Sequence, residues 1–350
     1  MQLNAYDWSY ADWKKWMKGV GEPAFRADQV MDWLYVKRVP SFADMTNLSR
    51  GLRERLERDF LLKPLETLTA QESADGTIKF LFQLVDGHAI ETVIMRHNYG
   101  NSVCVTTQVG CRVGCTFCAS TLGGLKRDLK AGEVVAQVVE AQRYLDRWGE
   151  RVHSVVMMGI GEPFENYDAS VQFMRVIQDE KGLNLGQRRI TVSTSGIVPS
   201  IYRFAEEGLQ VGLAISLHAP NQALRKKLMP VSYRYPLEEL LAACRYYVKK
   251  TGRRLTYEYA LIGGKNDAPE QAHELGKLLE GSGSLINLIP VNYVPERNYT
   301  RTPRNRIFKF RDILQSYDLN TTIRREHGSD IEAACGQLRA QHLGLEQQTV

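Results

Sequence analysis

The chain has 350 residues, of which 43% are hydrophobic and 24% are charged, and its formal net charge is +5. This composition is typical of a folded globular protein and excludes a disordered or fibrous chain. The N-terminus lacks the basic start and apolar core of a signal peptide, and no run of roughly 18 apolar residues could cross a bilayer as a helix. We therefore expect a soluble, cytoplasmic protein with no membrane segment.

The first hundred residues are predicted to form two small units. Residues 1–62 are expected to be a helical domain, because apolar side chains such as Trp13, Trp16 and Met17 recur at helical spacing. Residues 63–100 are expected to be a β-meander, in which Asp75-Gly76 and Asp86-Gly87 supply the positive φ angles of tight hairpins. Its strands are predicted at Thr67–Ser73, Thr77–Val85 and His88–Met95.

Residues 101–350 alternate between strand and helix patterns. Strands are predicted near Ser102–Gln108, Ser154–Met158, Ile190–Thr194, Val211–Ser216, Leu255–Ile262 and Leu285–Pro290. Helices are predicted at Ala131–Trp148, Tyr167–Asp179, Pro236–Lys250 and Pro269–Gly281. Repeated units of this kind form a parallel sheet, so the fold class is α/β, with a partial (β/α)6 barrel. Reacting groups should lie at the C-terminal ends of its strands.

Three closely spaced cysteines give the sharpest chemical signal. Cys111, Cys115 and Cys118 form a C-x3-C-x2-C pattern with Phe117 before the last cysteine. Three thiolates are one short of a closed zinc site, whereas a [4Fe-4S] cluster held by three cysteines keeps one iron open for another ligand. We therefore predict an iron-sulfur cluster. A zinc site completed by a distant residue is the alternative.

Polar motifs follow the predicted strands. Met158 to Pro163 reads Met-Gly-Ile-Gly-Glu-Pro, in which Gly161 allows close backbone approach and Glu162 can receive an ammonium group. A tight turn is the alternative reading of this motif alone. Further polar side chains end later strands and together indicate the lining of one pocket, although each could be an ordinary loop residue: Ser193, Ser216, His218 and Asn292.

Three other residues are candidates with plain alternatives. Glu91 shares a strand face with Val93 and Met95, so it is either a desolvated proton acceptor or an exposed glutamate on an edge strand. Cys335 lies between glycines near the C-terminus and says little by itself. Cys244 lies in an apolar helix and is expected to be buried and inert.

The cysteine pattern resembles the signature of the radical S-adenosylmethionine (SAM) superfamily. Nearly the whole chain resembles, more specifically, the RlmN family of radical SAM RNA methyltransferases. The segments that carry this resemblance are Phe25 to Tyr35, Cys104 to Cys111, Met158 to Pro163, Ser216 to His218, Leu288 to Asn292 and Ala333 to Leu338.

The resemblance implies a mechanism with two SAM molecules per turnover. Cys335 would accept a methyl group from the first, and a 5′-deoxyadenosyl radical from the second would remove a hydrogen from that methyl group. The carbon would then add to adenine C2, Glu91 would take the C2 proton, and Cys104 would resolve the adduct and form a disulfide bond. Leu217 would join Gly161, Glu162 and the strand-end residues in binding SAM.

The resemblance also implies the partners. The substrates would be adenosine 2503 of 23S rRNA and adenosine 37 of some tRNAs, gripped by the N-terminal domain and by basic clusters such as Arg225 to Lys227 and Arg301 to Arg311. Each cluster by itself is best read as a solvated face. Flavodoxin or ferredoxin would supply electrons, and we expect a monomer.

Three alternatives stay open at this stage. The related Cfr enzymes methylate C8 of the same rRNA adenosine, and we favour C2 because the stretch from Asn287 to Arg297 resembles RlmN. A non-catalytic iron-sulfur or zinc sensor that binds RNA would need no SAM pocket. A radical SAM enzyme with an unrelated substrate would not need both Cys104 and Cys335.

Overall fold

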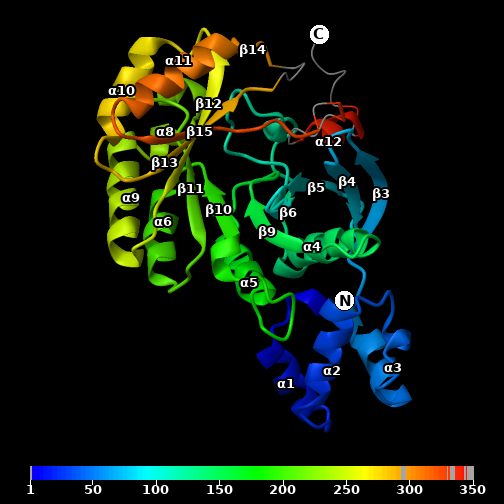
Figure 1. Cartoon of the computed structure of the whole chain (residues 1–350). Coiled ribbons are helices and arrows are strands. Elements are labelled where there is room, and N and C mark those ends of the chain that lie inside the picture. Colours follow the sequence, from blue (N-terminus) through cyan, green and yellow to red (C-terminus); the bar gives the residue numbers. More distant parts are fainter. Residues whose placement is uncertain (1, 293–296, 329, 332–335, 343, 345–350) are drawn as a thin grey trace.

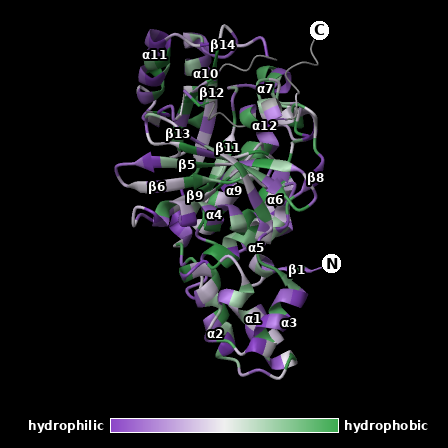
Figure 2. Ribbon diagram, turned by 90° about the vertical axis from the view of Figure 1, so that its right-hand side faces the viewer, coloured by the Kyte–Doolittle hydropathy of each residue, from purple (hydrophilic) through white to green (hydrophobic). Residues whose placement is uncertain are grey.

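The computed structural model describes residues 2–292, 297–328, 330–331, 336–342 and 344. In this part of the chain, a helical module at the N-terminal end lies below a curved sheet, and helices cover the outer side of that sheet (Figure 1). The view turned by 90° shows the same module projecting from the barrel below α4 and α5 (Figure 2). No described helix is long and apolar enough to span a membrane.

The N-terminal module is built from short helices around a tryptophan core. Ser9 caps the first helix, since its hydroxyl accepts from the Asp12 backbone N–H at 3.3 Å. Trp13 is fully buried, and Phe60 packs against it with ring centroids 4.7 Å apart. The elements are β1 (Leu3–Asn4), η1 (Ala5–Asp7), α1 (Tyr10–Gly19), α2 (Arg26–Met31), η2 (Asp32–Val36), η3 (Phe42–Asp44), α3 (Arg50–Asp59) and β2 (Phe60–Leu61).

Helix α4 (Ala131–Asp146) joins this module to the barrel. The Asp7 carboxylate accepts a hydrogen bond from the backbone N–H of Gly132, in the first turn of α4, at 2.6 Å. Nearer the other end of α4, the Arg143 guanidinium donates to the carbonyls of Arg38 at 2.9 Å and Val39 at 2.8 Å. These contacts fix the module against the outside of the barrel, away from the strand ends.

Among the described residues, one 11-stranded sheet runs in the order β15-β13-β12-β11-β10-β9-β6-β5-β4-β3, with β14 (Thr300–Arg301) paired to β12. The β-meander forms its antiparallel part: β3 (Leu65–Glu72), β4 (Ile78–Leu84) and β5 (Ala89–His97), which pairs with β6 (Gly100–Cys104). From β6 onward the sheet is parallel through β9 (Val152–Met157), β10 (Ile190–Thr194), β11 (Gly212–Ser216), β12 (Thr256–Gly263), β13 (Leu285–Pro290) and β15 (Asn320–Ile323).

Helices follow most of the parallel strands. They are α5 (Tyr167–Ile177), α6 (Val198–Glu206), α7 (Gln222–Leu228), α8 (Val231–Arg234), α9 (Leu237–Thr251), α10 (Pro269–Leu279) and α11 (Arg304–Gln315), with the turns η4 (Ala119–Thr121) and η5 (Gln187–Arg189). The hairpin of β7 (Gln108–Val109) and β8 (Arg127–Asp128) encloses the cysteine loop, and α12 (Gln337–His342) ends the described chain beside β5.

The α/β fold class and the partial barrel are therefore confirmed, and each predicted strand and helix is present within a few residues of its predicted bounds. The parallel run extends beyond the predicted six units, because α11 is followed by β15 at the edge of the sheet.

Candidate active site

A cavity of about 270 Å³ opens at the C-terminal ends of the parallel strands. The cysteine loop forms one wall, and the ends of β9, β10, β11, β12 and β13 form the rest. Of the residues that sequence reasoning assigned to the cluster and to SAM, all but Leu217 line it. The lining includes Cys111, Cys115, Phe117, Cys118, Met158, Gly161, Glu162, Ser193, Ser195, Ser216, His218, Glu258, Pro290, Asn292 and Arg324.

The three thiols of the cysteine loop gather on one side of this cavity. Burial raises the pKa of Cys111 to about 12 and the pKa of Cys115 well above its ordinary value, and the neighbouring Cys118 raises both further. Metal ligation requires the thiolate form, so a bound metal would offset this cost of burial.

The set of three thiols fits a cluster that keeps one iron open. In the described part of the chain, no three histidine, cysteine, aspartate or glutamate side chains are grouped as ligands of one metal ion. The cysteines of a [4Fe-4S] cluster each bind a different iron, so they need not converge on one point. The donor set thus fits the predicted cluster.

The glycine-rich turn after β9 forms the floor beside the cysteines. Gly161 has a φ of +113°, and a Cβ there would meet the backbone N of Gln108 at 2.8 Å, so only glycine fits without displacement. The next residue, Glu162, is buried, and its two carboxylate oxygens accept the backbone N–H groups of Phe164 at 2.9 Å and Ser195 at 2.6 Å. Burial raises the pKa of Glu162, so a cationic ligand would favour its ionised form.

His218 is held in an unusual backbone conformation at the end of β11. Its φ is +56°, which a non-glycine residue rarely adopts, and its carbonyl accepts from the Asn266 amide at 2.8 Å. The backbone N–H of Ala260 donates to Nδ1 of the ring at 2.9 Å, so in the neutral ring Nε2 carries the proton. Phe117 of the cysteine loop packs edge-on against this ring, with centroids 5.0 Å apart. The strand end and the cysteine loop are thereby locked together.

Arg225 is a site residue that sequence reasoning placed wrongly. It was grouped with Lys226 and Lys227 as a basic cluster, but it is fully buried. Its guanidinium donates to carbonyls at the ends of two strands: Ser195 at 2.6 Å, Ser216 at 3.3 Å and Leu217 at 3.2 Å. Burial lowers its pKa to about 10, which still leaves it charged at neutral pH. Arg225 therefore sets the spacing between β10 and β11.

Leu217 contributes through its backbone. Its side chain is completely buried in the main hydrophobic core, outside the cavity lining, while its carbonyl accepts from Arg225. Glu258, which sequence reasoning missed, lines the cavity instead and accepts from the Asn287 amide at 2.9 Å. Its place in the run Tyr257-Glu258-Tyr259 carried no signal, because an alternating strand normally turns such a glutamate toward solvent.

The predicted proton acceptor is buried on the inner face of the sheet. Glu91 on β5 is 4% exposed, so the inward alternative is the correct one. The Lys79 ammonium lies 3.1 Å from its Oε2, and the backbone N–H groups of Gly336 and Arg339 donate to Oε2 and Oε1, each at 2.7 Å. Cys335 lies outside the described residues, but its neighbour Gly336 is bonded to Glu91.

The predicted resolving thiol lies on the same face. Cys104 on β6 is paired in register with Val93 on β5, two residues from Glu91, and packs with Val93 and Met95. Met158 packs against Val93, Met95 and Cys104 and also lines the active-site cavity. Cys104 therefore lies next to that cavity. Gly336, with a φ of +83°, packs against Ser120 just after the cysteine loop, where a Cβ would meet the Ser120 backbone N at 2.9 Å.

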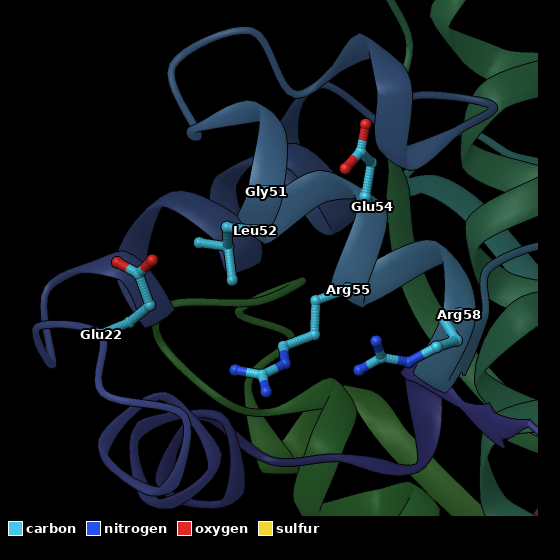
Figure 3. Close-up of a pocket in the computed structure, with 6 residues that line it drawn as sticks. All are labelled: Glu22, Gly51, Leu52, Glu54, Arg55 and Arg58. Carbon is cyan, nitrogen blue, oxygen red and sulfur yellow. The ribbon is translucent and has the colours of Figure 1, made fainter.

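A second cavity, of about 310 Å³, lies on the N-terminal module (Figure 3). Its lining shares no residue with the cysteine pocket and consists of Glu22, Gly51, Leu52, Glu54, Arg55 and Arg58. The arginines are already engaged within the module: Arg58 pairs with Asp59 at 2.8 Å and Arg55 donates to the Val20 carbonyl at 3.4 Å. The chemistry therefore belongs to the barrel.

Comparisons with known proteins agree with this geometry. Residues 3–62 match the family model of the ribosomal RNA large subunit methyltransferase N-terminal domain, and residues 105–276 match that of the radical SAM superfamily. Radical SAM enzymes use a [4Fe-4S] cluster and SAM, and the cysteine loop with its adjoining pocket fits this pair.

Similarity extends over nearly the full length of known relatives. The chain is 63% identical to a probable dual-specificity RNA methyltransferase RlmN of Halalkalibacterium halodurans and 62% identical to that of Bacillus cytotoxicus, covering 96% of this chain and 92% of each relative. The crystal structure of a radical SAM methyltransferase from Sphaerobacter thermophilus superposes with a TM-score of 0.93 at 47% identity, over 96% of this chain and 98% of that one. The chain therefore belongs to the RlmN family of radical SAM RNA methyltransferases.

Proposed function

We propose that this enzyme methylates C2 of adenosine 2503 in 23S rRNA and of adenosine 37 in some tRNAs, through a methyl-cysteine at Cys335 and a covalent protein–RNA adduct. The relatives' names supply the dual specificity. One observation carries the mechanism: the Glu91 carboxylate binds the backbone N–H of Gly336, directly after Cys335, on the face that holds Cys104.

A covalent carrier answers a chemical difficulty. Adenine C2 is electron-poor and does not attack the sulfonium of SAM, so a methyl group cannot be transferred to it directly. When bound, the cluster and two SAM molecules supply the methyl group and the hydrogen abstraction that makes it reactive. The sulfur of Cys335 holds this carbon covalently and delivers it to C2, so one difficult transfer is divided into two easier steps.

Two side chains then release the product. The Glu91 carboxylate accepts the proton that leaves C2, and the Lys79 ammonium, 3.1 Å away, holds that carboxylate in place. The radical adduct first gives up its unpaired electron, which the cluster would take back. As C2 loses its proton, the Cys104 thiolate attacks the sulfur of Cys335 and a Cys104–Cys335 disulfide forms. The electron pair of the broken sulfur–carbon bond stays with the carbon, which takes up a proton to become the methyl group. An external thiol reductant restores both thiols, and we propose flavodoxin or ferredoxin as the donor of the electron that cleavage of SAM would require.

SAM is proposed to bind in the cavity at the strand ends. Glu162 receives its ammonium group, and Ser193, Ser216, His218 and Asn292 line the remaining polar wall. The enzyme acts as a monomer in the cytoplasm, the compartment in which both RNA substrates occur.

Cysteine variants test the covalent route. Cys104→Ala is expected to accumulate enzyme joined to RNA, seen as a shifted band on a denaturing gel after anaerobic turnover. The double variant Cys104→Ala/Cys335→Ala should give no such band, and Cys244→Ala, which alters a buried cysteine on α9, should behave as the wild type. Release of free, unmodified RNA by Cys104→Ala would contradict the resolving role.

A further inference from the structure

A groove of about 520 Å³, separate from the cavity on the N-terminal module, adjoins the active-site cavity. It lies where the end of β13, β14, the start of α11 and the end of β15 come together, at the opposite end of the molecule from the N-terminal module (Figure 1). Its lining residues are Pro290, Arg301, Thr302, Arg304, Ile307, Phe308, Ile323, Arg324, Arg325 and Glu326.

The groove carries an excess of positive charge. Among the described residues, Glu326 is the one acidic side chain of the lining, and Arg301 engages it in an ion pair of 2.7 Å. The other arginines of the lining, Arg304, Arg324 and Arg325, form no ion pair with any residue in the described part of the chain. Guanidinium groups that are not engaged in ion pairs can form charge-assisted hydrogen bonds to phosphate oxygens.

Two further features of the lining are suited to a ligand. Thr302 is 1% exposed, and its hydroxyl has no hydrogen-bond partner among the described residues, which is uncommon for a buried polar group. Phe308 is half-buried, with the Arg304 guanidinium 5.5 Å from its ring centroid. An aromatic ring beside an arginine provides a stacking surface for a nucleobase.

The groove continues directly into the active-site cavity. Pro290, at the end of β13, and Arg324, just after β15, line both spaces. The Arg324 backbone N–H donates to the Leu288 carbonyl at 2.8 Å, so its position is fixed by the sheet. A polymer with one unit inside the cavity would place its neighbouring units along this groove.

We propose that this groove binds the phosphodiester backbone of the RNA nucleotides next to the target adenosine. The proposal rests on the proposed function, since it assumes that an adenosine is turned out of its strand into the cavity. Flanking phosphates then lie at the cavity mouth, where Arg304, Arg324 and Arg325 neutralise them. An acidic protein would match the charge too, but the continuity with the catalytic cavity favours RNA.

The test compares RNA binding by matched variants of the cluster-loaded enzyme. Arg304→Gln/Arg325→Gln removes two groove charges, while Lys277→Gln alters an exposed lysine of α10 outside the groove and outside the basic clusters. Arg324 is left intact because it also lines the catalytic cavity. The probe is a fluorescent tRNA anticodon stem-loop with adenosine 3′ of the anticodon, and its Kd is measured over a range of salt concentrations.

The double variant is expected to bind this RNA about tenfold more weakly. The slope of log Kd against log salt should fall by about 0.7 for each phosphate that an arginine no longer neutralises. Lys277→Gln should match the wild type, and SAM affinity should be unchanged in all three proteins.

Three outcomes would overturn the groove proposal: an unchanged salt slope in the double variant, an equal loss of binding in Lys277→Gln, or intact RNA binding combined with slower reduction of the cluster by flavodoxin. The last outcome would identify the groove as a docking site for the reductant. Failure of the proposed function is separate, because the wild-type enzyme would then form no methylated adenosine even though it binds the probe.

Discussion

The ammonium group of Lys79 lies 3.1 Å from the carboxylate of Glu91, and both side chains are buried, at 0% and 4% exposure. The two residues are diagonal neighbours on β4 and β5, because Lys79 is paired in register with Val93. Removing one partner of a buried ion pair leaves an uncompensated charge, whereas removing both charges leaves none.

Lys79→Met is therefore expected to lower the free energy of unfolding by about 3–5 kcal/mol. The double variant Lys79→Met/Glu91→Gln should recover part of this loss, because the amide oxygen still accepts from one of the two backbone N–H groups, those of Gly336 and Arg339, that the carboxylate binds. Chemical denaturation of the wild type, the two single variants and the double variant measures the coupling free energy between Lys79 and Glu91. Equal stability of Lys79→Met and the wild type would show that the pair does not form in solution.

Cluster binding should depend on three cysteines and no others. Changing Cys111, Cys115 or Cys118 to alanine removes one thiolate of the loop, so bound iron should fall to near zero after anaerobic reconstitution. Cys244→Ala removes a cysteine whose pKa burial raises to about 12 on α9, and it should retain its iron. Iron and sulfide analysis with the absorption spectrum measures this. Full iron in any loop variant would contradict the ligand assignment.

Acid sensitivity should arise partly from His218. Burial lowers the pKa of its ring to about 3, below the ordinary value of 6.5. Because the unfolded chain binds a proton that the folded chain does not, the stability from the neutral ring is complete above about pH 6.5 and is lost as the pH falls toward 3.

His218→Asn removes this titration while Oδ1 can still accept from the Ala260 N–H, and asparagine tolerates a positive φ. Between pH 7.5 and 5 the wild type should lose about 2 kcal/mol more stability than the variant. Denaturant midpoints across this range, at equal cluster content, measure the difference. Parallel curves for the two proteins would contradict a buried neutral ring.

Arg225 should support SAM binding indirectly, because its hydrogen bonds set the spacing between the ends of β10 and β11. Arg225→Met leaves the carbonyls of Ser195, Ser216 and Leu217 without their charged donor, so stability should fall by about 3 kcal/mol and SAM affinity should weaken. Lys227→Met, an exposed neighbour on the same helix, serves as the control. Calorimetric titration with SAM measures the affinity. An unchanged affinity in Arg225→Met would show that Arg225 does not support SAM binding.

Much of the fold was predictable because βα units have strong local signals. The predicted strands carry apolar runs between turn residues, and the helices carry apolar periodicity. The edge strand β15 was missed, since Asn320, Thr321 and Thr322 form a short polar segment without such a run. The orientation of Glu91 could not be decided from its strand, because both faces of β5 are buried and period-two alternation is absent.

The site was predictable where residue identity implies chemistry, as in the cysteine loop and the glycine-rich turn. Arg225 and Glu258 were not, because their burial depends on contacts between elements far apart in the sequence. A lysine such as Lys79 in a strand is normally exposed, and only the pairing of β4 with β5 shows that it faces Glu91.

Analysis of the methylated nucleoside is the most direct test of the central claim. Cluster-loaded enzyme is incubated anaerobically with SAM, a reductant and unmodified 23S rRNA fragments or tRNA, and the digested RNA is analysed by mass spectrometry. We predict 2-methyladenosine in both RNAs. Formation of 8-methyladenosine, or of no methylated adenosine by enzyme with an intact cluster, would contradict the proposed reaction.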